Sequence, residues 1–158
     1  MKNHIASFPL YSLLTMVDHL ASNADGGNFK WVNWLPLKIN CFVWRLMLDR
    51  IPLSNNLAAR GISVTSVVCK MCHRGDESVE HVFFRCDYAL SMCNWICKWS
   101  GLLNIALIDF DSFVSYANLL KPDVRRWNLL LSLGYSALWL IWKERNERFF
   151  GKMSKKPM

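Results

Sequence analysis

Four residues have the types and the spacing of a metal-binding site. Cys69, Cys72, His81 and Cys86 form the pattern C-x2-C-x8-H-x4-C. Proteins bind Zn2+ tetrahedrally, through Cys sulfurs at about 2.3 Å and His nitrogens at about 2.0–2.1 Å. Three thiolates and one imidazole fill all four positions and leave none for a substrate. We therefore expect one structural zinc ion rather than a catalytic one.

His73 is the alternative to His81 as the fourth ligand, because it directly follows Cys72. Adjacent residues are geometrically awkward as ligands of one ion, whereas a helix can aim His81 at the metal, so we prefer His81. Such a site does not exist in the unfolded chain. Zinc binding is therefore expected to supply much of the folding free energy of residues 67–88.

The remaining cysteines fit buried apolar positions. Cys41 lies in the middle of a hydrophobic predicted helix, and free cysteine is often a small core residue. Cys93 and Cys97 are four positions apart and share one helix face, where metal binding is an alternative to core packing. The N-terminus lacks the pattern of a secretory leader, so we expect reduced thiols and an intracellular location, nuclear or cytoplasmic.

Helices are expected to position the four ligands. Pro36 suits a helix start, Ser54 suits an N-cap, and Gly61 suits a helix end. The segment Ile62–Val68 is β-branched and extended, and it leads into the CxxC pair. The expected class is mainly α, a helical domain around a small Cys3His zinc knuckle with at most a short β-hairpin. The predicted helices are Leu37–Arg50, Asn55–Arg60, Val79–Arg85, Asp87–Trp99, Asp109–Leu120 and Pro122–Phe150.

The chain divides into four expected segments. Residues 1–29 are an N-terminal segment, in which residues 5–20 form a short helix or an irregular docking segment, and a loop. Residues 30–101 hold the zinc-binding domain, and residues 102–150 form a helical extension that packs on it. Residues 151–158 are a basic tail.

The apolar stretch Leu129–Trp142 is too short to cross a membrane. It has 14 residues, interrupted by Ser132, Gly134 and Ser136, whereas a span needs about 20. We expect a buried core helix and no membrane partner.

The charge distribution is compatible with a polyanionic partner. The net charge is +7, and two basic blocks, at residues 27–74 and 121–158, flank an acidic centre. Phe83 or Phe84 could stack on an unpaired base, although core packing is an equal alternative, as is a solvated face for the basic residues. The side chains predicted to bind RNA or DNA are Arg50, Arg60, Lys70, Arg74 and Arg85.

Catalytic patterns are absent from the sequence. It contains no GxSxG, HExxH, P-loop or Gly-rich dinucleotide motif. Asp109 and Asp111 are explained better as a helix cap and a first-turn acid than as a catalytic pair. We expect a binding module and no enzyme. The eight tryptophans leave protein interaction, with a polymerase domain or a second copy, as the alternative function.

Several segments resemble the zinc-binding domain attached to reverse transcriptases of plant non-LTR (LINE-type) retrotransposons. The resemblance covers most of residues 30–150. It rests on these segments: Trp34-Leu35-Pro36-Leu37-Lys38-Ile39-Asn40-Cys41-Phe42-Val43-Trp44-Arg45, Asp49-Arg50-Ile51-Pro52-Leu53-Ser54-Asn55-Asn56-Leu57, Arg60-Gly61, Cys69-Lys70-Met71-Cys72, Glu80-His81-Val82-Phe83-Phe84-Arg85-Cys86 and Ile141-Trp142-Lys143-Glu144-Arg145-Asn146.

The resemblance implies that Cys69, Cys72, His81 and Cys86 are the metal ligands. Modules of the family lie at the C-terminal end of element-encoded polyproteins, and the resemblance also implies binding to the RNA or target DNA of such an element. The chain has no Ala-Asp-Asp polymerase motif, and no acidic set for an RNase H or an endonuclease is evident. The expectation is thus a zinc module without its enzyme, or a non-functional relic of one.

Overall fold

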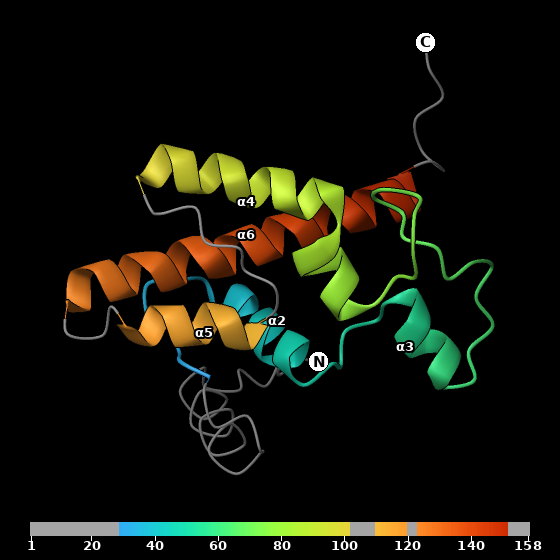
Figure 1. Cartoon of the computed structure of the whole chain (residues 1–158). Coiled ribbons are helices and arrows are strands. Elements are labelled where there is room, and N and C mark those ends of the chain that lie inside the picture. Colours follow the sequence, from blue (N-terminus) through green and yellow to red (C-terminus); the bar gives the residue numbers. More distant parts are fainter. Residues whose placement is uncertain (1–28, 102–109, 120–122, 152–158) are drawn as a thin grey trace, which may run out of the picture. The chain divides into compact units, whose positions relative to one another are not determined.

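The computed structural model describes residues 29–101, 110–119 and 123–151 (Figure 1). The described residues from Trp31 onward belong to one compact unit. The helix and loop expected before residue 29 and the tail after residue 151 lie outside the described residues. The described helices are α2 (Leu37–Met47), α3 (Ser54–Ala59), the π-helical turn η1 (His81–Arg85), α4 (Asp87–Ser100), α5 (Phe110–Leu119) and α6 (Val124–Gly151).

The predicted fold class is confirmed. The described part of the chain is mainly helical and contains no β-strand. The hairpin allowed by the sequence is reduced to one antiparallel bridge, between Val68 and Asp76.

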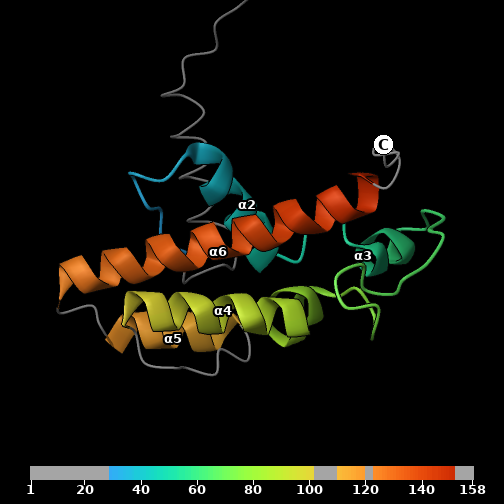
Figure 2. The same ribbon diagram turned by 90° about the horizontal axis from the view of Figure 1, so that it is seen from above.

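Helix α6 is the element against which the other long helices pack. Figure 2 shows α2 on one side of α6 and α4 and α5 on the other, and all three contact it. An aromatic cluster joins α2 to α6, because Phe42 lies 5.4 Å from Trp139 and 5.7 Å from Trp142 between ring centres. Phe42 also lies 6.0 Å from Phe83 of η1. This cluster places η1, which carries a predicted metal ligand, against the core.

A buried amide fixes the chain that enters α2. Asn40 is 2% exposed, and its Oδ1 accepts the backbone N–H of Val32 at 3.0 Å. Its Nδ2 donates to the carbonyl of Val32 at 3.1 Å. A buried polar side chain is tolerated when it is hydrogen-bonded in this way, so Asn40 ties the loop before α2 to the helix.

Several predicted helix ends differ from the structure, most clearly the end of α2 and the start of α3. Helix α2 stops at Met47 rather than Arg50, and Asp49 follows with a left-handed backbone (φ 50°). Ser54 is the first residue of α3 rather than its cap, since its hydroxyl is engaged by Glu77. Gly61 does follow the end of α3 with φ 76°, a conformation that glycine adopts without strain.

The apolar stretch Leu129–Trp142 lies within α6, and its buried side chains include Leu131, Leu138 and Ile141. Among the described residues, no helix is both long enough and apolar enough to span a bilayer. Gly134, which interrupts the stretch, lies where α5 approaches α6. A Cβ there would overlap with Cζ of Phe113.

Gly134→Ala is expected to destabilise the protein although alanine is the better helix former. Alanine ordinarily stabilises a helix interior by about 1 kcal/mol relative to glycine. Here the ring of Phe113 must move, and overpacking of this kind costs about 1–3 kcal/mol. Urea denaturation followed by circular dichroism measures the change. Phe113→Leu in the Gly134→Ala background should recover part of the loss, and a more stable single variant would contradict the packing described.

Candidate metal centre

The four predicted ligands meet at one point. The ligand atoms of Cys69, Cys72, His81 and Cys86 all lie within 4.8 Å of one another. The Sγ atoms of Cys69 and Cys86 are 4.0 Å apart, and Cys72 Sγ lies 3.2 Å from His81 Nε2. A tetrahedral zinc ion with bonds of about 2.3 Å to sulfur requires sulfur–sulfur distances of about 3.8 Å. The donor set and its dimensions therefore fit one closed zinc site.

The first two ligands lie in a tight hairpin, residues 67–77, which we call the zinc hairpin. The backbone N–H of Cys69 donates to the carbonyl of Gly75 at 3.0 Å, and that of Glu77 donates to Val67 at 2.7 Å. Gly75 has φ 66°, which turns the chain at low cost because glycine has no side chain. The sequence of extended chain, CxxC and glycine thus closes on itself and places both sulfurs on one side.

The other two ligands are joined by the π-helical turn. The backbone N–H of Cys86 donates to the carbonyl of His81 at 2.6 Å, five residues earlier. On an ordinary α-helix, residues five apart point about 140° away from each other, since each residue turns by about 100°. The wider π turn brings both side chains to the metal. The helix predicted for Val79–Arg85 is thus corrected at its core to a π turn over His81–Arg85, a feature frequent at functional sites.

The structure places His81, and not His73, among the ligand atoms. The ring of His81 packs on Gly75, where an added Cβ would lie 3.4 Å from Cε1. His73 is exposed and has φ 56°, so it serves as a turn residue of the zinc hairpin.

The environment of the sulfurs disfavours free thiolates. Burial raises the pKa of Cys69, and it raises the pKa of Cys86 to about 12, with the neighbouring Cys69 contributing. Backbone N–H groups of Tyr88 and Ala89, at the start of α4, partly oppose the shift at Cys86. At neutral pH these two thiols are therefore protonated in the absence of metal. Zinc, which binds thiolates, must displace their protons.

A buried ion pair connects the zinc hairpin to α6. Glu77 and Arg145 are 0% and 3% exposed. Arg145 Nε donates to Glu77 Oε1 at 2.9 Å, and its Nη2 donates to Oε2 at 2.5 Å. Oε2 also accepts the backbone N–H of Ser54 at 3.0 Å and the Ser54 hydroxyl. The carboxylate thus holds the start of α3 as well as α6.

The last turns of α6 contact the zinc hairpin a second time. Arg148 Nη1 donates to the carbonyl of Met71 at 3.0 Å, between the ligands Cys69 and Cys72. Arg148 is itself oriented by Glu144, whose carboxylate lies 2.7 Å from its Nε. Helix α6 therefore supports the backbone on which two ligands sit.

Sequence analysis missed the roles of Glu77, Arg145 and Asn40. Glu77 lies in the acidic centre of the sequence, and charged residues are rarely fully buried unless paired. The sequence does carry a signal for Arg145, because the segment Ile141–Asn146 belongs to the family resemblance. The segment is structural, since Ile141 is fully buried and Arg145 binds Glu77.

The other cysteines are separate from the cluster. Cys41, Cys93 and Cys97 are free and partly buried. Burial raises the pKa of Cys41 and of Cys93. Their surroundings are those of packed thiols.

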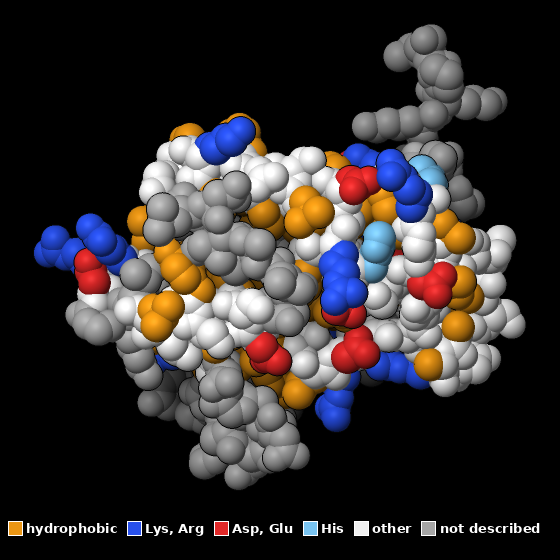
Figure 3. Space-filling view, in the orientation of Figure 1, with side chains coloured by type: hydrophobic (Ala, Val, Ile, Leu, Met, Phe, Trp, Pro, Cys, Tyr) orange, Lys and Arg blue, Asp and Glu red, His pale blue; other side chains and the backbone are white. Residues whose placement is uncertain are grey.

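The residues predicted to bind nucleic acid have different surroundings. Arg50 and Arg60 are exposed. Arg74 forms an ion pair with Asp87 at 3.3 Å, and Arg85 forms one with Glu80. Lys70 is half-buried, with its Nζ 6.0 Å from the centre of the Phe149 ring. Basic and acidic side chains are interspersed around the histidines on the face drawn in Figure 3.

Phe83 and Phe84 are core residues. Their exposed fractions are 1% and 7%. Stacking on an unpaired base is thus excluded for these two rings, and the alternative of core packing is correct.

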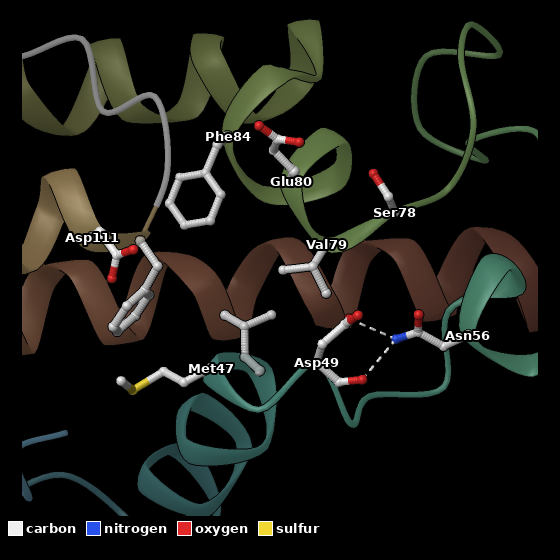
Figure 4. A pocket seen from close by; sticks show the side chains of 10 residues that line it. Met47, Asp49, Asn56, Ser78, Val79, Glu80, Phe84 and Asp111 are labelled. Atoms are coloured by element: carbon white, nitrogen blue, oxygen red, sulfur yellow. Dashed lines mark hydrogen bonds between the residues drawn. The ribbon is translucent and has the colours of Figure 1, made fainter. Parts of the chain in front are cut away.

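A pocket of about 480 Å³ lies apart from the metal ligands (Figure 4). Asp49 is held there by Asn56, whose Nδ2 donates to its Oδ1 at 2.8 Å, and Glu80 is paired with Arg85. No basic side chain lines the pocket, so it does not suit a phosphate. The lining residues are Leu46, Met47, Asp49, Asn56, Ser78, Val79, Glu80, Phe84, Phe110 and Asp111.

The fold and the site define a small helical module built around one structural zinc ion. The model of the family described as zinc-binding in reverse transcriptase matches residues 9–93, more than half of the chain, and all four ligands lie inside the match. The chain belongs to this family. No curated protein and no solved structure matches it.

Removal of zinc is expected to unfold the zinc hairpin and η1. In Cys69→Ser, or after treatment with a strong chelator, amide hydrogens of residues 67–88 should exchange much faster, because metal binding supplies their folding free energy. Hydrogen exchange read by mass spectrometry, with metal analysis, measures this. Cys41→Ser, outside the cluster, should retain one zinc per chain. Purified protein without zinc, whose exchange a chelator leaves unchanged, would disprove the assignment.

Arg145→Met is expected to destabilise the protein by roughly 3–5 kcal/mol, because it leaves the buried Glu77 carboxylate without its counter-charge. The double variant Glu77→Gln/Arg145→Met should recover much of this loss. Urea unfolding of the zinc-loaded proteins measures both changes. Equal losses in the single and double variants would show that the charge on Glu77 is not the cause.

The Glu77–Arg145 pair also makes the free energy of unfolding depend on pH in a predictable direction. Burial by itself raises the pKa of Glu77, but hydrogen bonds from Arg145 and Ser54 lower it below its ordinary 4.5. The stabilisation from Glu77 is therefore complete above about pH 4.5 and is lost as the pH falls through the lowered folded value. In Arg145→Met burial dominates and the sign reverses. The stability gap between wild type and variant should therefore narrow from pH 7.5 to pH 5.

Proposed function

We propose that this chain is a zinc-stabilised nucleic-acid-binding module of a LINE-type reverse transcriptase, with no polymerase activity of its own. The observation that carries the proposal is the closed Cys3His cluster in a chain of this family. A zinc ion with four protein ligands has no position for a substrate. The module then acts through the surface that the ion holds in shape.

Two exposed arginines depend on that shape. Arg50 follows α2 and Arg60 follows α3, and α3 is tied to the zinc hairpin through Ser54 and Glu77. Zinc binding therefore fixes the helix that lies between Arg50 and Arg60 in the chain. Guanidinium groups bind phosphates through paired hydrogen bonds.

Arg74 and Arg85 remain available to phosphates despite their ion pairs. Both pairs are more than half exposed at each side chain, and an exposed ion pair contributes only about 0–1 kcal/mol. A phosphate can therefore replace Asp87 or Glu80 at small cost. An intracellular location, nuclear or cytoplasmic, accords with reduced ligand thiols.

Protein interaction is the second candidate function. Trp95 and Trp99 are 65% and 70% exposed and lie one turn apart on α4. Exposed tryptophans are enriched at protein interfaces. A reverse transcriptase or a second copy of the chain is the proposed partner. Light scattering with and without RNA separates the two functions, since an oligomer that ignores nucleic acid favours this one.

Binding to RNA or DNA is expected to weaken steeply with salt, because phosphate contacts release counterions. The affinity for a labelled oligonucleotide is measured by fluorescence anisotropy at salt concentrations from about 50 to 200 mM. The slope of log affinity against log salt concentration gives the number of phosphate contacts. Arg50→Gln and Arg60→Gln should each weaken binding to all sequences and reduce the slope by about one.

The matched control is Arg125→Gln. Arg125 is exposed near the start of α6, and the helix rise places it about 30 Å along the axis from Arg145. It carries the same charge change and should leave the slope unaltered. No binding by the wild type at low salt, or a slope reduced equally by the control, would refute the proposal.

A further inference from the structure

Two aromatic rings at the end of α6 lie beside the zinc hairpin. Phe149 and Phe150 are 42% and 63% exposed, and their ring centres are 4.8 Å apart in a T-shaped arrangement. Contiguous exposed apolar surface of this kind often marks an interaction site. Their position next to the metal site indicates which kind of ligand they bind.

Phe149 is held from within the protein. The guanidinium of Arg145 lies 4.6 Å from its ring centre, and that guanidinium is fixed by Glu77. About one turn further along α6, Arg148 donates a hydrogen bond to the carbonyl of Met71. Phe149 is thus an anchored ring, and Phe150, packed edge-to-face against it, presents the more exposed surface.

A cation stands beside these rings. Lys70 Nζ lies 6.0 Å from the centre of the Phe149 ring. No carboxylate of the described residues forms an ion pair with Lys70, whereas Arg145 and Arg148 are paired with Glu77 and Glu144. Lys70 lies between the ligands Cys69 and Cys72, so the metal fixes its backbone. Its charge is therefore available to an anion at the edge of the aromatic pair.

We propose that Phe150, Phe149 and Lys70 form a site for an unpaired nucleotide of a single strand, in which the base stacks on Phe150 and Lys70 binds an adjoining phosphate. An exposed ring beside an unpaired ammonium group matches the two parts of a nucleotide. A base-paired duplex offers only its phosphates here, because its bases are already stacked. The proposal rests on the proposed function and adds a strand preference to it.

The test compares strands at fixed salt. The zinc-loaded 158-residue chain is titrated against a labelled 15-nucleotide poly-dT or poly-U strand and against a 15-base-pair duplex. Phe150→Ala should weaken single-strand binding by about tenfold, since stacking contributes about 1–3 kcal/mol per base, while duplex binding and the salt slope stay unchanged. Phe150→Trp, which keeps a ring, should bind the single strand as well as the wild type.

Two further variants complete the test. Lys70→Gln should weaken binding to both probes and reduce the salt slope by about one. Leu119→Ala removes another exposed apolar side chain, 75% exposed on α5, and should change nothing. All variants are first shown to have wild-type unfolding midpoints and one zinc per chain.

The outcomes separate this site from the wider function. If the wild type binds in a salt-dependent way and Phe150→Ala binds equally well, the stacking site is overturned and the proposed function is retained. The same holds if Phe150→Ala weakens the binding of strand and duplex equally. Concentration-dependent dimers of the wild type that Phe150→Ala abolishes assign the rings to a protein contact instead. No binding of either probe by the wild type overturns both.

Discussion

The Glu77 carboxylate is the point on which the arrangement of the zinc module depends. Its two oxygens accept hydrogen bonds from the start of α3 and from Arg145 of α6, and its own backbone N–H closes the zinc hairpin. Removing two charges from water costs several kcal/mol per ion, and this cost is offset only when the hydrogen bonds are complete. Three segments distant in sequence, the zinc hairpin, the start of α3 and α6, are therefore joined at one buried carboxylate.

Zinc and the Glu77–Arg145 ion pair each join the zinc hairpin to other elements of the fold. The metal joins Cys69 and Cys72 to His81 and Cys86, and so joins the hairpin to η1 and the start of α4. The ion pair joins it to α3 and α6. Within residues 67–77 the buried side chains are those of Cys69, Met71 and Glu77, so the hairpin has little apolar surface of its own to hold it by packing. The aromatic cluster around Phe42 then fixes α2 and η1 against α6, so the cross-links act on a packed core and not on isolated loops.

The metal ligands could be predicted because spacing and donor chemistry constrain them tightly, and the main helices because their apolar residues recur with a helical period. Glu77 could not be predicted, since nothing local distinguishes a buried acid from its solvated neighbours Asp76 and Glu80. The burial of Phe83 and Phe84 follows from contact with α2 and α6, more than thirty residues away on either side. Ser54 was expected to cap α3 with its own hydroxyl, and a distant carboxylate took that position.

The π turn between His81 and Cys86 also affects how relatives of this site are recognised. A π turn accommodates one more residue than an α turn while the chain continues as a helix. On an α turn, two ligands separated by three residues would already share a face. A spacer of three residues and a spacer of four can therefore deliver the same pair of donor atoms, through different backbones. Gaps of one residue in an alignment at this position would then be changes of helix type, with the coordination sphere conserved.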